Sequence, residues 1–155
     1  MKILPHSQTD ALDRLLQVVV LLNDDMTEAL EGLGLTPSRA RLVWLLHHGG
    51  PATQRALADA LKVTPRNVTG LVDALVDTEF VVRHPHPTDR RATLVSLTEH
   101  GASVLADMDR DHQEFAELLF GGMSGRQFDS FVHGLDHLLR RLREALQAQH
   151  QRGGK

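Results

Sequence analysis

Residues 53–97, TQRALADALKVTPRNVTGLVDALVDTEFVVRHPHPTDRRATLVSL, decide the fold of this chain. The stretch opens with two apolar patterns of helical spacing, over 53–61 and 64–76, separated by only Lys62 and Val63. Each pattern starts at a threonine, which is a good N-cap, and the proline after Thr64 suits the first turn of a helix. Two short helices joined by so short a turn are typical of a helix-turn-helix.

The rest of this stretch changes from a helical to an extended pattern. Residues 80–83 and 92–97 are β-prone and flank a polar, proline-rich segment, HPHPTDRR, at 84–91. Two such runs around a turn segment predict a β-hairpin, or wing. The prolines fix φ, and we expect them to hold the basic tip away from the body of the protein.

Helical patterns flank this stretch on both sides. Before it, we expect one long helix that ends near residues 32–34 and a second that starts at Thr36-Pro37 and ends at Gly49-Gly50, with Leu42, Val43, Leu45 and Leu46 on its core face. After it, Thr98 starts a helix to about residue 120, and Ser124 starts a last one with apolar steps of three and four. The sequence therefore predicts a mainly α fold with six helices and a small β-wing.

Composition narrows the possible functions. The 155 residues are 41% apolar and 24% charged, as in an ordinary globular protein. The chain has no cysteine, which excludes disulfides, thiolate zinc sites, cysteine nucleophiles and thiol redox switches. This is compatible with a reducing cytosol, and we expect a cytoplasmic protein. The longest nearly apolar run, residues 15–22, is far short of the ~20 residues that a bilayer requires, and acidic residues precede it, so we expect no membrane partner and no signal peptide.

The net charge of −3 argues, on its own, against a nucleic-acid partner. Charge is distributed unevenly, however. Residues 1–35 hold two basic and six acidic side chains, whereas residues 51–97 hold six basic and five acidic ones. Of those acids, Asp73, Asp77 and Glu79 fall late in the 64–76 helix or just after it, so we expect the edge formed by its start and by the wing to be basic.

The wing contains the pattern D-x-R-x-x-x-V-x-L-T, which residues 89–98, DRRATLVSLT, match at every defined position. With the VTGLVDAL segment at 68–75 and the Thr36-Pro37 helix start, the chain resembles the MarR family of winged helix-turn-helix transcriptional regulators over nearly its whole length. The resemblance implies a sequence-specific DNA-binding protein, most simply a ligand-responsive repressor that binds a pseudo-palindromic operator as an intertwined homodimer. It divides the chain into an N-terminal dimerisation helix (1–35), a DNA-binding lobe (36–98), C-terminal dimerisation helices (99–150) and a tail (151–155).

The first turns of the second helix of the helix-turn-helix are expected to enter the major groove of double-stranded DNA. The residues concerned are Thr64, Pro65, Arg66, Asn67 and Thr69. Arginine can donate to guanine O6 and N7, and asparagine can pair with adenine N6 and N7. Thr69 can offer its hydroxyl to a phosphate or its methyl to a thymine methyl. The alternative is an ordinary polar face.

Arg90 and Arg91 at the wing tip suit the narrow minor groove of A·T-rich DNA. By resemblance, Asp89 is the carboxylate that orients Arg91. Arg83, with His84 and His86, is expected to contact phosphates, as are Thr53 and Arg55 at the start of the 53–61 helix.

The sequence gives weaker signals for an effector site and for a metal site. By resemblance, Trp44 with His47 or His48 is a candidate pocket for a small aromatic or phenolic effector, although tryptophan is more often a core residue. His133 and His137 have i, i+4 spacing but lack a zinc-protease motif, and we interpret them as surface residues. A zinc-responsive regulator remains an alternative, weakened by Arg39 and Arg41 where ligands would be needed, as does a protein-interaction module. No enzyme motif is present, and we expect no metal, no cofactor and no catalysis.

Overall fold

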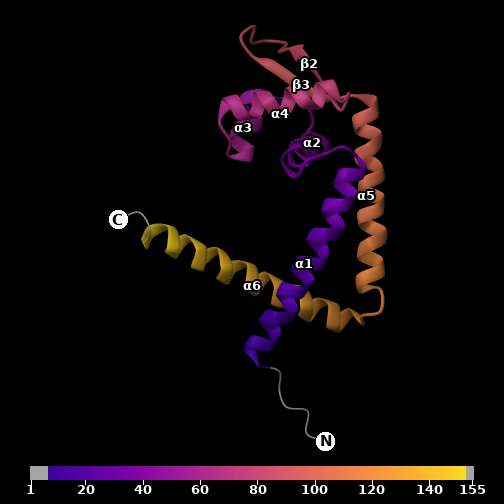
Figure 1. Cartoon of the computed structure of the whole chain (residues 1–155), viewed down its shortest axis with the longest axis vertical. Helices are drawn as coiled ribbons and strands as arrows, with labels where there is room; N and C mark the ends of the chain where they lie inside the picture. Colours follow the sequence, from indigo (N-terminus) through magenta and orange to yellow (C-terminus); the bar gives the residue numbers. More distant parts are fainter. Residues whose placement is uncertain (1–6, 153–155) are drawn as a thin grey trace, which may run out of the picture. The chain divides into compact units, whose positions relative to one another are not determined.

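The computed structural model describes residues 7–152, and side chains are described to residue 149. Over these described residues the chain forms nine elements: α1 (Gln8–Gly32), α2 (Pro37–Gly49), β1 (Ala52–Thr53), α3 (Gln54–Leu61), α4 (Pro65–Asp77), β2 (Val81–Pro85), β3 (Thr93–Leu97), α5 (Glu99–Phe120) and α6 (Gly125–Arg152). The six predicted helices and the wing are confirmed (Figure 1). The chain divides into two compact units, and the boundary between them lies within α5, after Asp107. Residues 1–6 and 153–155, parts of the expected N-terminal segment and tail, lie outside the description, and α6 extends to Arg152.

Side-chain caps start the helices at the predicted positions. The hydroxyls of Thr36, Thr53 and Thr64 each accept the main-chain N–H three residues on, at 3.1–3.3 Å. Such bonds satisfy an N–H that has no partner inside the helix. Ser124 caps α6 in the same way, with Gln127 reaching back to the Ser124 N–H. Helix α1 begins at a capping box formed by Ser7 and Asp10, which lies before the apolar pattern predicted for this helix. The Ser-x-x-Asp spacing is the sequence signal for this cap.

The first unit contains the core of the protein. It is built from Leu42, Val43 and Leu46 of α2, Leu57 and Leu61 of α3, and Val68, Val72 and Leu75 of α4, with Phe80, Val81 and Val95 from the wing and its base. The prediction that Leu45 also faces this core is wrong. The Leu45 side chain lies about a third of a helical turn away from that of Leu46 and is 36% exposed.

The sheet has three strands where the sequence predicted two. In the order β1-β3-β2 all neighbours are antiparallel, and the two-residue β1 pairs Ala52 with Val95 and Thr53 with Leu94. In the hairpin, Val81 pairs with Leu97 and Pro85 with Thr93, which leaves residues 86–92 as the wing tip. Phe80, predicted to start the strand, instead turns into the core. Because β1 pairs with β3 just before α3 begins, it fixes the start of the helix-turn-helix against the base of the wing.

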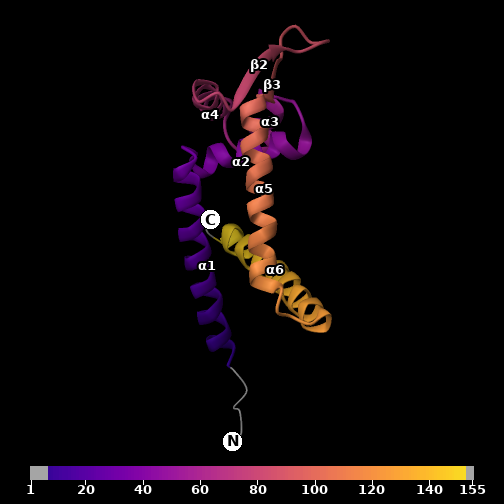
Figure 2. The same ribbon diagram turned by 90° about the vertical axis from the view of Figure 1, so that its right-hand side faces the viewer.

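The second unit holds the end of α5 and α6. The Phe120 ring lies 5.6 Å from the rings of both Phe128 and Phe131, measured between centroids. These contacts close the turn between the two helices. Figure 2 shows both helices from a second direction. None of the helices in the described part of the chain is both long enough and apolar enough to cross a membrane.

Candidate nucleic-acid interface

The start of α4 presents polar side chains to solvent. Val68, Val72 and Leu75 bury one face of this helix, and the predicted contact residues Thr64, Pro65, Arg66, Asn67 and Thr69 are all exposed. Thr64 is already engaged, because its hydroxyl accepts the Asn67 N–H at 3.2 Å. Arg66 and Asn67 therefore carry the side-chain groups of the first turn that are suited to base edges.

Thr69 uses its hydroxyl inside the protein. The Oγ1 atom donates to the Pro65 carbonyl at 2.9 Å and accepts from Gln54 Nε2 at 3.2 Å. Of the two roles predicted for Thr69, the hydroxyl bond to a phosphate would compete with these bonds. Contact through the methyl group would not, and the geometry favours it.

A polar network joins α3, α4 and β2 at the base of the wing. Arg83 on β2 donates through Nε to Gln54 Oε1 at 2.9 Å and through Nη2 to Asp73 Oδ1 at 2.5 Å. Gln54 continues the network to Thr69. The guanidinium of Arg83, predicted to contact phosphate, is thus already paired with a carboxylate. This arrangement holds the wing against α4 and pairs the negative charge of Asp73 with Arg83.

Sequence reasoning assigned no role to Gln54 or to the Asp73–Arg83 pair. The partners are 29 and 10 residues apart, so no local spacing signals them. They come together because the turn at residues 78–80 brings β2 back alongside α4, and because β1, just before Gln54, joins the same sheet. Their arrangement is a property of the tertiary fold.

The wing tip carries Asp89, Arg90 and Arg91, all exposed. The Asp89 carboxylate accepts the main-chain N–H of Arg91 at 2.9 Å, and Ala92 N donates to the Asp89 carbonyl at 3.0 Å. Asp89 therefore shapes the backbone that carries the arginines, whereas the resemblance implied that it orients the Arg91 side chain.

The start of α3 lies beside the sheet. The Thr53 hydroxyl is the N-cap, accepting the Ala56 N–H at 3.1 Å, and Arg55 is exposed in the first turn. A helix N-terminus with an exposed arginine is suited to a phosphate oxygen. Of the two residues predicted here, Arg55 is the one whose side chain is directed to solvent.

The candidate effector residues cluster on α2. Trp44 is half-buried, and its ring centroid lies 6.0 Å from that of His47 and 4.7 Å from that of His48. The two imidazoles are 5.0 Å apart. The cluster is a small aromatic surface with polar edges, which suits a flat aromatic ligand better than a metal.

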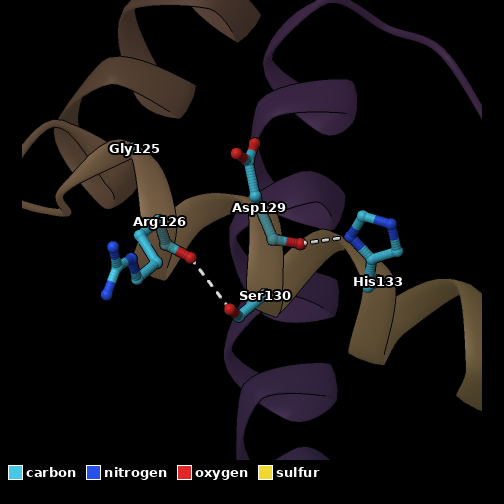
Figure 3. Close-up of a pocket in the computed structure, with 5 residues that line it drawn as sticks. All are labelled: Gly125, Arg126, Asp129, Ser130 and His133. Atoms are coloured by element: carbon cyan, nitrogen blue, oxygen red, sulfur yellow. Dashed lines mark hydrogen bonds between the residues drawn. The ribbon is translucent and has the colours of Figure 1, made fainter.

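A separate hollow lies on α6 (Figure 3), lined by Gly125, Arg126, Asp129, Ser130 and His133. Its polar groups bond to their own helix: His133 Nδ1 donates to the Asp129 carbonyl at 2.8 Å, and Ser130 Oγ to the Arg126 carbonyl at 2.9 Å. The Asp129 carboxylate points away from the His133 ring (Figure 3). In the part of the chain that the structure describes, no three His, Cys, Asp or Glu side chains gather as a metal site would require.

The pair α3–α4 with the hairpin behind it defines a winged helix-turn-helix protein. Comparison with known proteins agrees. Residues 35–93 match the model of the MarR family. Its fold matches RV1404 from Mycobacterium tuberculosis with a TM-score of 0.75, 25% identity and coverage of 90% of this chain and 97% of the other. A MepR variant from S. aureus bound to an oligodeoxyribonucleotide matches with a TM-score of 0.65, 20% identity and coverage of 88% and 99%.

Among curated proteins, the chain is 33% identical over 91 residues to the HTH-type transcriptional regulator MhqR of Bacillus subtilis, covering 59% of this chain and 63% of MhqR. It is 35% identical over 79 residues to the HTH-type transcriptional repressor NicR of Pseudomonas putida, covering 51% and 50%. The aligned part thus spans between about half and two thirds of these relatives.

Proposed function

We propose that this protein is a transcriptional regulator that binds DNA through α4 and the wing, acts as a repressor in the cytoplasm, and has no catalytic role. The observation that carries the proposal is that Arg66 and Asn67 on α4 and Arg90 and Arg91 at the wing tip are exposed on elements that one polar network holds together. The α4 residues suit a major groove and the wing arginines an adjacent minor groove. The names of MhqR, NicR and the DNA-bound MepR support the same role.

The test uses a fluorescent DNA fragment from upstream of the protein's own gene and measures anisotropy at fixed salt. Arg91→Ala is expected to weaken specific binding by about 1–3 kcal/mol, or about 5- to 150-fold. Arg140→Ala on α6 is the matched control, since it removes the same charge from an exposed position outside the lobe. Equal affinities of the Arg91 variant and the wild type would remove the wing from the proposal. If selection from a genomic library yielded no specific fragment for the wild type, the proposal itself would fail.

The same proposal includes a homodimer built from the terminal helices. The segment Val18-Val19-Val20-Leu21-Leu22 of α1 is apolar around the whole helix, and each of its residues is 41–69% exposed. A helix that is apolar on all sides is normally buried. The exposed apolar residues of α6, Leu138, Leu139, Leu142 and Leu146 among them, form a second such surface. A second copy of the chain is the partner that fits, because a two-fold axis pairs the same patch with itself.

The proposed repressor is released by a small aromatic or phenolic acid bound near Trp44, His47 and His48. Trp44 is the single tryptophan of the chain, so its fluorescence reports on this site directly. Benzoate and hydroxybenzoates are expected to quench it saturably and to lower DNA affinity over the same concentration range. Quenching that is linear in ligand up to millimolar concentrations would count against an effector site at this position.

A further inference from the structure

The wing tip is organised around the imidazole of His86. Its Nδ1 atom lies 3.1 Å from the main-chain nitrogen of Asp89, 3.3 Å from that of Thr88 and 3.4 Å from the Thr88 hydroxyl oxygen. A backbone N–H can only donate, so Nδ1 must accept and must carry no proton. The ring is then the neutral Nε2–H tautomer, a protonation state assigned from the hydrogen-bond partners.

These bonds belong to a chain of contacts that ends at the arginines. His86 N donates to the Ala92 carbonyl at 3.2 Å and closes the tip across its base. Asp89, held by the imidazole through its own N–H, accepts the Arg91 N–H on its carboxylate. Pro85 and Pro87 on either side of His86 fix φ and reduce the alternative conformations of the turn.

We propose that His86 is a positioning residue of the wing: its neutral ring fixes the turn that presents Arg90 and Arg91, and protonation of Nδ1 opens that turn and weakens DNA binding. A proton on Nδ1 turns the acceptor into a donor that faces two backbone donors, so both backbone bonds are lost, and of its neighbours only the Thr88 hydroxyl could accept from it. The inference rests on the proposed DNA-binding function for its consequence, but not for the geometry of the turn.

The charged and titratable groups around His86 belong to the wing. In the tip they are Asp89, Arg90 and Arg91, and the Asp89 carboxylate is engaged with the Arg91 N–H. On the neighbouring strand residues, His84 Nε2 lies 2.5 Å from Ser96 Oγ, and Arg83 is paired with Asp73 at the base.

The sign of the pH effect separates this role from a phosphate contact. Histidine changes charge between pH 5 and 8. If His86 served DNA binding as a cation near a phosphate, acidification would strengthen binding. As the acceptor that holds the turn, it weakens binding on acidification. The difference between wild type and a variant that lacks the titrating group isolates the effect of His86 from that of the other histidines.

The first experiment needs no DNA. In the ¹⁵N-labelled full chain at pH 8, long-range ¹H–¹⁵N spectra are expected to show His86 as the Nε2–H tautomer. On titration to pH 5.5, the Thr88 and Asp89 amide signals should shift together with the His86 ring. An Nδ1–H tautomer at pH 8, or Thr88 and Asp89 amides that do not respond to the ring, would overturn the inference while leaving the proposed function intact.

The second experiment measures operator affinity for wild type, His86→Asn and His86→Gln at constant ionic strength. Asparagine places a non-titrating acceptor on Cγ, where Nδ1 is attached, whereas glutamine places it one bond further out. At pH 8 we expect His86→Asn to bind within about twofold of wild type and His86→Gln to bind about fivefold more weakly. Between pH 8 and 5.5, wild type should lose up to about tenfold more affinity than His86→Asn, since only the fraction with a closed turn binds well.

Tighter binding of wild type than of His86→Asn on acidification would assign a phosphate contact instead and overturn the proposal. Wild-type affinity in His86→Gln at pH 8 would also overturn it. Loss of operator binding by every protein, wild type included, would refute the proposed function and with it the role of the turn in DNA binding, while the tautomer spectrum still decides the geometry of the turn.

Discussion

The side chain of Asp10 makes the stability of the first turn of α1 depend on pH. Its carboxylate accepts the Ser7 N–H at 3.0 Å while its own N–H donates to the Ser7 hydroxyl at 3.0 Å. The backbone bond to Ser7, and after it the Ser7 side chain, hold the pKa of Asp10 below its ordinary value of 3.8. A carboxyl with a lowered pKa in the folded chain stabilises the fold above its unfolded pKa, and this contribution is lost as the pH falls through the folded value.

We therefore predict that the first turn of α1 loosens only when the pH falls below about 4, as Asp10 becomes protonated. The carboxyl ¹³C shift of Asp10 should titrate below 3.8, and the Ala11 amide, which donates to Ser7 O, should lose protection over the same range. In Ser7→Ala, which loses the hydroxyl but keeps the backbone N–H, the pKa of Asp10 should move part of the way up. A carboxyl that titrates at 3.8 or above in the wild type would contradict the capping box.

In the first compact unit, the packing of α5 on the residues before the wing depends on a glycine. Thr98 N donates to the Phe80 carbonyl at 3.0 Å, and the Thr98 hydroxyl accepts the Gly101 N–H at 2.9 Å, which caps α5 as predicted. A Cβ on Gly101 would lie 2.2 Å from the Phe80 carbonyl oxygen, a main-chain atom that cannot swing away. The close approach of α5 to Phe80, between α4 and β2, therefore requires glycine at this position.

Gly101→Ala is predicted to lower the free energy of unfolding by about 1–3 kcal/mol, the usual cost of overpacking. Gly134→Ala on α6 is the matched control. Its Cβ would meet no atom within 4 Å, and alanine is favoured over glycine inside a helix by up to about 1 kcal/mol. Urea unfolding at equal protein concentration should thus give opposite signs for the two variants. A Gly101→Ala protein as stable as wild type would mean that α5 can shift away from Phe80.

The ion pair that links the wing to α4 gives a further prediction, in which the direction of the change in DNA affinity is informative. Asp73→Asn removes a negative charge from the lobe, and on charge alone it should strengthen DNA binding. Because Asp73 holds Arg83 in place, we predict weaker binding instead, about two- to fivefold, as expected for an ion pair that is partly exposed.

Asp77→Asn is the control for this change. Asp77 is also exposed on α4, one turn further along, so the substitution removes the same charge without touching the Arg83 pair. Anisotropy titrations on the same operator should show unchanged or slightly tighter binding for this variant. If both variants bound more tightly than wild type, Arg83 would be a phosphate contact after all, and Asp73 only a local repulsion.

How far each element was predictable depended on how local its cause is. Threonine and serine caps act within three residues, so the starts of α2 to α6 could be read from sequence. Strand β1 has two residues and no pattern of its own, and it exists because β3 offers it partners. The arginines of the wing were identifiable from their motif, but the bonds of Gln54 with Arg83 and Thr69 were not, since each joins segments that meet only in three dimensions.

At the scale of the whole molecule, the chain divides its apolar surface unevenly. The first unit buries a core, with side chains from α2, α3, α4 and the wing and with Leu30 of α1 and Leu105 of α5. In contrast, Leu30 is the only described residue of α1 that is buried, and α6 buries none through residue 149. Exposed apolar surface on this scale marks an interface in a stable protein. The first unit therefore surrounds a buried core, whereas most of α1 and α6 leaves an apolar surface that a partner would cover.

We predict that the protein sediments at twice its 17.2 kDa chain mass at micromolar concentration and that Leu142→Glu shifts it towards the monomer. Leu142 is 56% exposed, so a glutamate there should leave the fold of the single chain intact, which far-UV circular dichroism can verify, but would be buried as an unpaired charge in a dimer. Gln147→Glu adds the same charge at another exposed position of α6 and should remain dimeric. A monomeric wild type would refute this assembly. A Leu142→Glu variant that is still fully dimeric would move the interface away from that face of α6. Because two linked lobes bind an operator more tightly than one, loss of the dimer should also reduce affinity for the full palindrome far more than affinity for a single half-site.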